Sequence, residues 1–130
     1  MTDAPQVVLD ASALLAALQG EPGGVAVEAR LDQAGLSTVN LAEVMQRSVA
    51  RGVAVEGLTK DLEALGVTIL PFTAEDAQLS ASLWPKTRHL GLSLGDRACL
   101  ALALRLGSPA LTTDQVWSQL EVDVNIQVLR

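Results

Sequence analysis

The sequence predicts a three-layer α/β fold, in which helices cover both faces of a central, mostly parallel sheet. Short apolar runs alternate along the chain with longer stretches of helical periodicity, the order typical of strands joined by helical crossovers. Hydrophobic residues make up 49% of the chain but aromatic residues only 2%, so Leu, Val and Ala must form the core, which suits a buried parallel sheet. The length of 130 residues fits one domain over residues 1–130.

Five short apolar segments have the length and composition of strands in such a sheet. The first ends directly at Asp10, and the third is stopped by Pro71, a residue that cannot continue a central strand. The predicted strands are residues 7–9, 36–39, 67–70, 110–112 and 125–129.

Helical spacing of apolar residues fills most of the chain between these strands. Gly35, Gly66 and Gly107 follow three of the helical segments, and glycine is common just past the end of a helix. Pro85 is expected to end or kink the fifth helix. The last long helix has almost no polar residues at 98–104, which indicates burial on most sides. The predicted helices are residues 11–18, 25–31, 41–49, 55–65, 74–83 and 94–106, with a short one near Trp117.

The charge of the chain restricts how it can act on nucleic acids. Fifteen Asp and Glu residues against nine Lys and Arg residues give a formal net charge of −6. An acidic protein does not attract polyphosphate through its overall field. Chemistry on nucleic acid would therefore depend on bound cations or on local basic patches, and a positively charged protein partner is also compatible with this charge.

The apolar segments and the first residues predict a cytoplasmic protein without a membrane anchor. The longest apolar run, residues 98–104, is far too short to span a bilayer. The first residues lack the basic side chains of a signal peptide. Cys99, the only cysteine, lies within the apolar run and is expected to be a small buried hydrophobe.

Four acidic residues stand where strands end or helices begin, and each has a structural explanation when taken alone. Two of them can cap the helix that follows them. The other two stand three residues after Asn40 and Ser93, the spacing of a capping box, and the one after Asn40 can also pair with Arg47 one turn along. The four acidic residues are Asp10, Glu43, Asp96 and Asp114.

Capping does not explain why so many carboxylates are expected at one edge of the sheet. In a parallel sheet, the carboxyl ends of the strands share an edge, and the following helices begin there. Carboxylates brought together raise one another's pKa unless a cation compensates their charge. A cluster of carboxylate oxygens without His or Cys suits Mg²⁺ or Mn²⁺ and not Zn²⁺. The sequence therefore predicts a site for a divalent cation.

Four sequence blocks resemble the PIN domain, and in particular the VapC-type toxins of bacterial toxin–antitoxin pairs. The blocks read Val-Leu-Asp-Ala-Ser, Asn-Leu-Ala-Glu-Val, Leu-Ser-Leu-Gly-Asp-Arg-Ala and Leu-Thr-Thr-Asp, at residues 8–12, 40–44, 92–98 and 111–114. They occur in the order of the family and span nearly the whole chain. The part of the sequence most specific to this family is the run at residues 93–103, which extends the third block.

The resemblance implies a ribonuclease in which metal ions orient a water for in-line attack on RNA. Ser12 and Thr112 match the hydroxyl positions beside two of the acids. Asp10, Asp96 and Asp114 take the metal-binding roles. The family also suggests a homodimer and a toxin inhibited by a small antitoxin protein. The catalytic acids are Asp10, Glu43, Asp96 and Asp114.

Arg97, Lys86, Arg88 and His89 could steer the RNA backbone near the site, and solvated surface charge is the alternative for each of them. Two enzyme classes with acids at strand ends fit poorly. A receiver domain needs a Lys after a late strand, and a haloacid-dehalogenase phosphatase needs a second Asp where Ser12 stands. A non-catalytic interaction module of the PIN fold is the main alternative.

Overall fold

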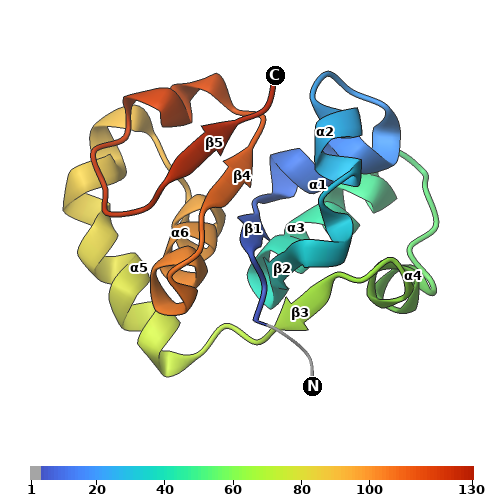
Figure 1. Ribbon diagram of the computed structural model, residues 1–130, viewed down its shortest axis with the longest axis horizontal. Helices are drawn as coiled ribbons and strands as arrows, with labels where there is room; N and C mark the ends of the chain where they lie inside the picture. Colours follow the sequence, from blue (N-terminus) through green and yellow to red (C-terminus); the bar gives the residue numbers. More distant parts are fainter. Residues whose placement is uncertain (1–3) are drawn as a thin grey trace.

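A computed structural model describes residues 4–130 and contains one five-stranded sheet in the order β3-β2-β1-β4-β5 (Figure 1). All neighbouring strands pair in parallel, so the predicted α/β class is confirmed. The central strand β1 pairs with β2 on one side and with β4 on the other. The strands are β1 (Val7–Leu9), β2 (Ala34–Ser37), β3 (Thr68–Leu70), β4 (Ala110–Thr112) and β5 (Ile126–Val128).

Helices cover both faces of this sheet and give the predicted three layers (Figure 1). Val7 and Leu9 of β1 pack into a core with α1 to α4, whereas Val8 points to the other face and packs with α5, α6 and η3. This alternation follows from the two-residue period of a strand. The helices are α1 (Ala11–Gln19), α2 (Gly24–Glu28), α3 (Thr38–Ala50), α4 (Leu58–Ala64), α5 (Ala74–Thr87) and α6 (Leu94–Leu106), with 3₁₀ turns η1 (Leu31–Gln33), η2 (Arg88–Leu90) and η3 (Gln115–Gln119).

Several element boundaries differ from the sequence predictions. Strand β2 begins at Ala34, so Gly35 lies inside a strand and does not end a helix. A Cβ atom on Gly35 would lie 3.0 Å from Pro5, and glycine therefore lets the segment before β1 pass close to β2. Helix α4 begins only at Leu58, after Gly57 in a left-handed conformation. Pro85 does not end α5, which continues to Thr87.

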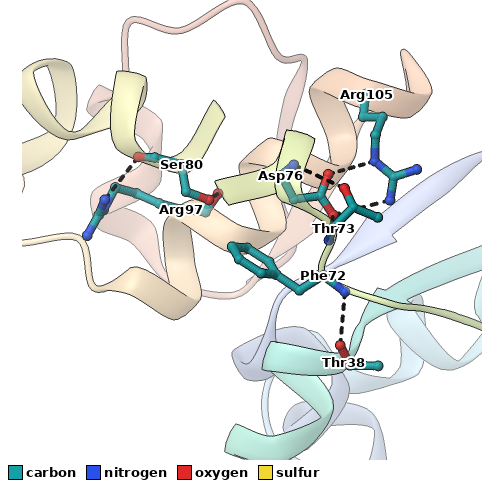
Figure 2. A network of polar contacts seen from close by, with 7 residues as sticks. All are labelled: Thr38, Phe72, Thr73, Asp76, Ser80, Arg97 and Arg105. Atoms are coloured by element: carbon teal, nitrogen blue, oxygen red, sulfur yellow. Dashed lines mark hydrogen bonds and ion pairs between the residues drawn. The ribbon is translucent and has the colours of Figure 1, made fainter. Parts of the chain in front are cut away.

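Helix α6 lies between the sheet and α5, and a polar network ties it to α5 (Figure 2). Asp76, in the first turn of α5, forms a capping box with Thr73. Arg105 donates from Nε to Asp76 Oδ1 at 2.6 Å and from Nη2 to Asp76 Oδ2 at 3.2 Å. This network fixes the C-terminal end of α6, while the N-terminal end of α6 carries Asp96.

The interior of α6 agrees with the burial expected from its sequence. Cys99 is fully buried, as predicted. Burial raises the pKa of its thiol, and the charges of nearby carboxylates raise it further. Within residues 4–130, no helix has the length and apolar character needed to cross a membrane.

Candidate active site

The four predicted acids line a single cleft of about 430 Å³. The cleft lies at the carboxyl ends of β1 and β4, where α1 and η3 begin, and α3 and α6 contribute the remaining walls. The lining residues are Asp10, Ala11, Ser12, Glu43, Arg47, Ser93, Asp96, Thr113, Asp114 and Arg130.

Asp10 is the most buried of these acids, with 2% of its surface exposed. It follows β1 and caps α1 by accepting from the Ala13 amide at 2.8 Å. Ser12 Oγ donates to both carboxylate oxygens at 2.8 and 2.9 Å, and Thr112 Oγ1 donates to Oδ2 at 2.5 Å. The structure thus brings both hydroxyls to Asp10, whereas the sequence placed them beside two different acids.

Burial raises the pKa of Asp10 from 3.8 to about 6, against the lowering effect of its hydrogen bonds from Thr112, Ala13 and Ser12. The negative charge of Asp96 raises the pKa further. Desolvation and repulsion from Asp96 therefore disfavour the ionised form of Asp10 in the folded protein, and a bound cation would relieve both effects.

Asp96 and Asp114 each take part in the cap of a helix and also line the cleft. Asp96 forms the predicted capping box with Ser93, accepting from the Ser93 amide at 2.9 Å through Oδ2. Asp114 accepts from the Val116 amide at 3.0 Å through Oδ1 and so caps η3. In both cases the capping bond uses one carboxylate oxygen, so the second oxygen is not needed for the cap.

Glu43 reaches the cleft from the second turn of α3, not from the first turn as the sequence suggested. The proposed capping box between Asn40 and Glu43 is wrong, because β2 ends at Ser37 and Ser37 caps α3 by accepting from Val39. The Glu43 carboxylate instead lies against the first turn of α6. A Cβ atom on Gly95 would be only 2.3 Å from either of its oxygens.

The donor set of this cleft fits a hard divalent cation such as Mg²⁺ or Mn²⁺. Carboxylate and hydroxyl oxygens surround the cleft, and its lining contains neither His nor Cys. Across residues 4–130, no three acidic, His or Cys side chains are already close enough to hold an ion together. The side chains therefore face one cleft but would have to turn toward an ion to ligate it.

Two arginines, Arg47 and Arg130, also line the acidic cleft. From the sequence, Arg47 was predicted only as a partner of Glu43, although residues four apart share a helix face. Arg130 was not among the predicted site residues. The signal was available, because Arg130 closely follows β5, whose carboxyl end meets the same edge of the sheet as β1 and β4.

The basic residues predicted to steer RNA near the carboxylates lie elsewhere. Arg97 donates from Nη1 to the Ser80 carbonyl at 2.9 Å and ties α6 to α5 (Figure 2). The Arg88 guanidinium lies 4.5 Å from the ring centre of Trp84. The remaining two, Lys86 and His89, line a separate cleft of about 390 Å³. The side chains around the carboxylate cleft include none of these four.

Comparisons with known proteins identify the family. Residues 7–123 match the PIN domain. A toxin–antitoxin complex from Klebsiella pneumoniae has a chain with a TM-score of 0.70 and 19% identity, covering 95% of this chain and 98% of that one. FitAcB from Neisseria gonorrhoeae has a TM-score of 0.69 and 22% identity, covering 92% of this chain and 95% of that one.

DNA-bound VapBC from Salmonella typhimurium is similar in fold, with a TM-score of 0.65 and 13% identity over 97% of this chain and 99% of that one. Comparison with curated protein sequences finds no match. The match to the PIN domain covers nearly the whole chain, including all four acids of the cleft. The chain therefore belongs to the PIN domain family.

Proposed function

We propose that residues 1–130 form a single PIN domain that cleaves RNA with a divalent cation and acts as the toxin of a VapC-type toxin–antitoxin pair. The observation that carries this proposal is the convergence of Asp10, Glu43, Asp96 and Asp114 on one cleft of about 430 Å³. The proposal is supported by structural neighbours that are described as toxin–antitoxin, VapBC and FitAB complexes.

The cation would be held by Asp10, Asp96 and Asp114. When bound, Mg²⁺ or Mn²⁺ supplies positive charge that stabilises the attacked phosphate and makes water a better nucleophile. The protein keeps Asp10 oriented through Thr112 and Ser12, whose hydroxyls donate to it. Such outer hydrogen bonds fix the orientation of a metal ligand and are needed for full metal affinity.

Glu43 and the two arginines have separate roles in this proposal. Glu43 would complete the ligand shell of the cation or accept a proton from the attacking water, and either role suits a carboxylate within the same cleft. Arg47 and Arg130 would contact the RNA phosphates on either side of the cleaved bond. They provide the local positive charge that a chain with a net charge of −6 needs for binding RNA.

The proposed partners are RNA as substrate, a cognate antitoxin as inhibitor and a second copy of the chain in a homodimer, within the cytoplasm. The acidic cleft indicates how an antitoxin would silence the site. An inserted Arg pairs with carboxylates in a bidentate manner and stays charged at all physiological pH values. It would compete with the cation and exclude the substrate phosphate.

A nuclease assay tests the function directly. Purified protein is incubated with a fluorescent single-stranded RNA and Mg²⁺ or Mn²⁺, with and without EDTA, next to Asp96→Asn and the control Asp123→Asn. Asp123 is exposed and lies outside the cleft, so the control removes a charge without touching the site. Cleavage that needs metal and Asp96 supports the proposal. Absence of cleavage with either metal supports the alternative, a non-catalytic PIN-fold interaction module.

A further inference from the structure

The side chain of Asn40 is fully buried between α3 and α6, next to the acidic cleft. Its amide nitrogen Nδ2 donates to Glu43 Oε1 at 2.9 Å and to the carbonyl of Gly95 at 2.9 Å. Asn40 and Gly95 are 55 positions apart in the sequence. One amide group therefore joins the helix that carries Glu43 to the first turn of the helix that carries Asp96.

The orientation of this amide is determined by its neighbours. Both partners of Nδ2 are acceptors, and a reversed amide would place Oδ1 against two oxygens. An Asp at this position would create the same repulsion. The environment therefore requires a side chain that can donate two hydrogen bonds from one nitrogen, which Asn provides at this length.

The carbonyl end of Asn40 argues against a role in stability alone. Oδ1 is buried and has no hydrogen-bond partner within residues 4–130. An unpaired buried carbonyl destabilises a fold, because it loses its hydrogen bonds to water without replacement. The carbonyl oxygen of Asn40 thus destabilises the fold, whereas its amide nitrogen orients a carboxylate of the cleft.

Gly95 provides the space into which Asn40 holds this carboxylate. The two oxygens of Glu43 lie 2.3 Å from the place where a Cβ atom on Gly95 would be. The Asn40 bond uses Oε1 of Glu43, so Oε2 remains for the cleft. The position of Glu43 relative to Asp96 is therefore set from both sides, by a donor on α3 and by a missing side chain on α6.

We infer that Asn40 is a positioning residue that holds Glu43 beside Asp96, with Gly95 as the surface against which Glu43 rests. The inference rests on the proposed nuclease function and specifies how one of its carboxylates is oriented. Asn40 does not line the cleft and acts only through Glu43.

A double-mutant cycle tests the inference. Asn40→Ala, Glu43→Gln and the double variant are compared for kcat and KM on single-stranded RNA and for the rise in Tm on adding Mn²⁺. Asn40→Ala is expected to lower kcat by about 10- to 100-fold with a small change in KM, and to reduce the Tm rise caused by Mn²⁺. In the Glu43→Gln background, Asn40→Ala should have no further effect on either quantity.

Ser80→Ala is the matched control, because Ser80 is also buried and bonds to α6, through the Arg97 carbonyl, without contacting a cleft residue. It should lower Tm and leave kcat and the Mn²⁺ response unchanged. If Asn40→Ala fails to fold, Gly95→Ala provides the second test. Ala usually stabilises a helix relative to Gly, so a well-folded Gly95→Ala with low kcat supports the inference, and full activity contradicts it.

This design distinguishes a failure of the positioning role of Asn40 from a failure of the proposed nuclease function. Additive effects of Asn40→Ala and Glu43→Gln, on kcat and on the Mn²⁺ response, would overturn the positioning role. If the wild-type protein does not cleave RNA, the proposed function fails, but the Mn²⁺-induced Tm rise still measures the coupling of Asn40 to Glu43. Coupling there supports the positioning role, and its absence overturns it.

Discussion

The Thr112 hydroxyl donates a 2.5 Å hydrogen bond to Asp10 across the pairing of β4 with β1, although the two residues are 102 positions apart. The same hydroxyl accepts from the Asp114 amide at 3.0 Å. Thr112 therefore connects two of the cleft carboxylates. Replacing it with Val keeps the shape of the side chain but removes both bonds.

Thr112→Val should weaken metal binding by about 10- to 100-fold, the usual effect of losing a hydrogen bond to a metal ligand. Isothermal titration with Mn²⁺ measures this directly. Thr68→Val is the control, since Thr68 is an exposed strand residue that does not line the cleft. Equal Mn²⁺ affinity in wild type and Thr112→Val would contradict a role of Thr112 in metal binding.

The metal-free protein should lose stability as the pH rises from about 4 to about 6. Asp10 has a pKa of 3.8 when unperturbed and about 6 in the fold, so in this window the folded state holds a proton that the unfolded chain has released. Stability therefore falls with pH, by up to about 3 kcal/mol for a shift of this size. Urea unfolding in EDTA measures the slope, and Asp10→Asn should flatten it while Asp123→Asn should not.

RNA cleavage by a water molecule should leave 5′-phosphate and 3′-hydroxyl ends, because the 2′-hydroxyl of the RNA takes no part. Labelling the products with polynucleotide kinase, before and after phosphatase treatment, identifies the ends. A 2′,3′-cyclic phosphate would rule out Glu43 as the acceptor of a proton from water. The activity would then have to come from a different site or a contaminant.

Arg47→Ala should weaken RNA binding without abolishing cleavage. One lost phosphate contact lowers the slope of log affinity against log salt by about 0.7 for a single strand. Fluorescence anisotropy on the inactive Asp96→Asn background measures this slope. Arg51→Ala is the matched control: Arg51 follows α3 one turn beyond Arg47 and does not line the cleft. Equal slopes in both variants would contradict a phosphate contact by Arg47.

Arg105→Ala should destabilise the fold by about 2–3 kcal/mol, because it leaves the buried Asp76 carboxylate without its cationic partner. Burial raises the pKa of Asp76, but hydrogen bonds from Arg105 and Thr73 outweigh it, and the net shift is downward. The stabilisation is therefore present at neutral pH and is lost as the pH falls below the ordinary Asp range. Unfolding curves for wild type and Arg105→Ala should converge at low pH and stay apart at pH 7.

The parts of the site that could be predicted from the sequence are those determined by local rules. Asp10 follows β1 directly, Asp114 follows β4 after one residue, and Asp96 lies in the first turn of a helix with a capping box, so a parallel sheet alone brings them to one edge. Glu43 was placed in the correct cleft, but in the wrong turn of its helix. The error arose because β2 ends two residues earlier than its apolar run.

The contacts that could not be predicted depend on how helices cross. The bond from Asn40 to Gly95 requires the packing of α3 on α6, and neither residue signals it in sequence. The same holds for Arg97, which lies one position after Asp96 but turns toward α5 because successive helical residues point about 100° apart.

The pairing of β1 with β4 also governs when the proposed site can form. The hydrogen bond across this pairing joins residues 102 positions apart, so the contact that closes the cleft has a very large sequence separation. A chain still being translated cannot form it until β4 has left the ribosome. The proposed site therefore stays incomplete in a nascent chain for as long as β4 has not emerged, because Asp10 then lacks the hydrogen bond from Thr112.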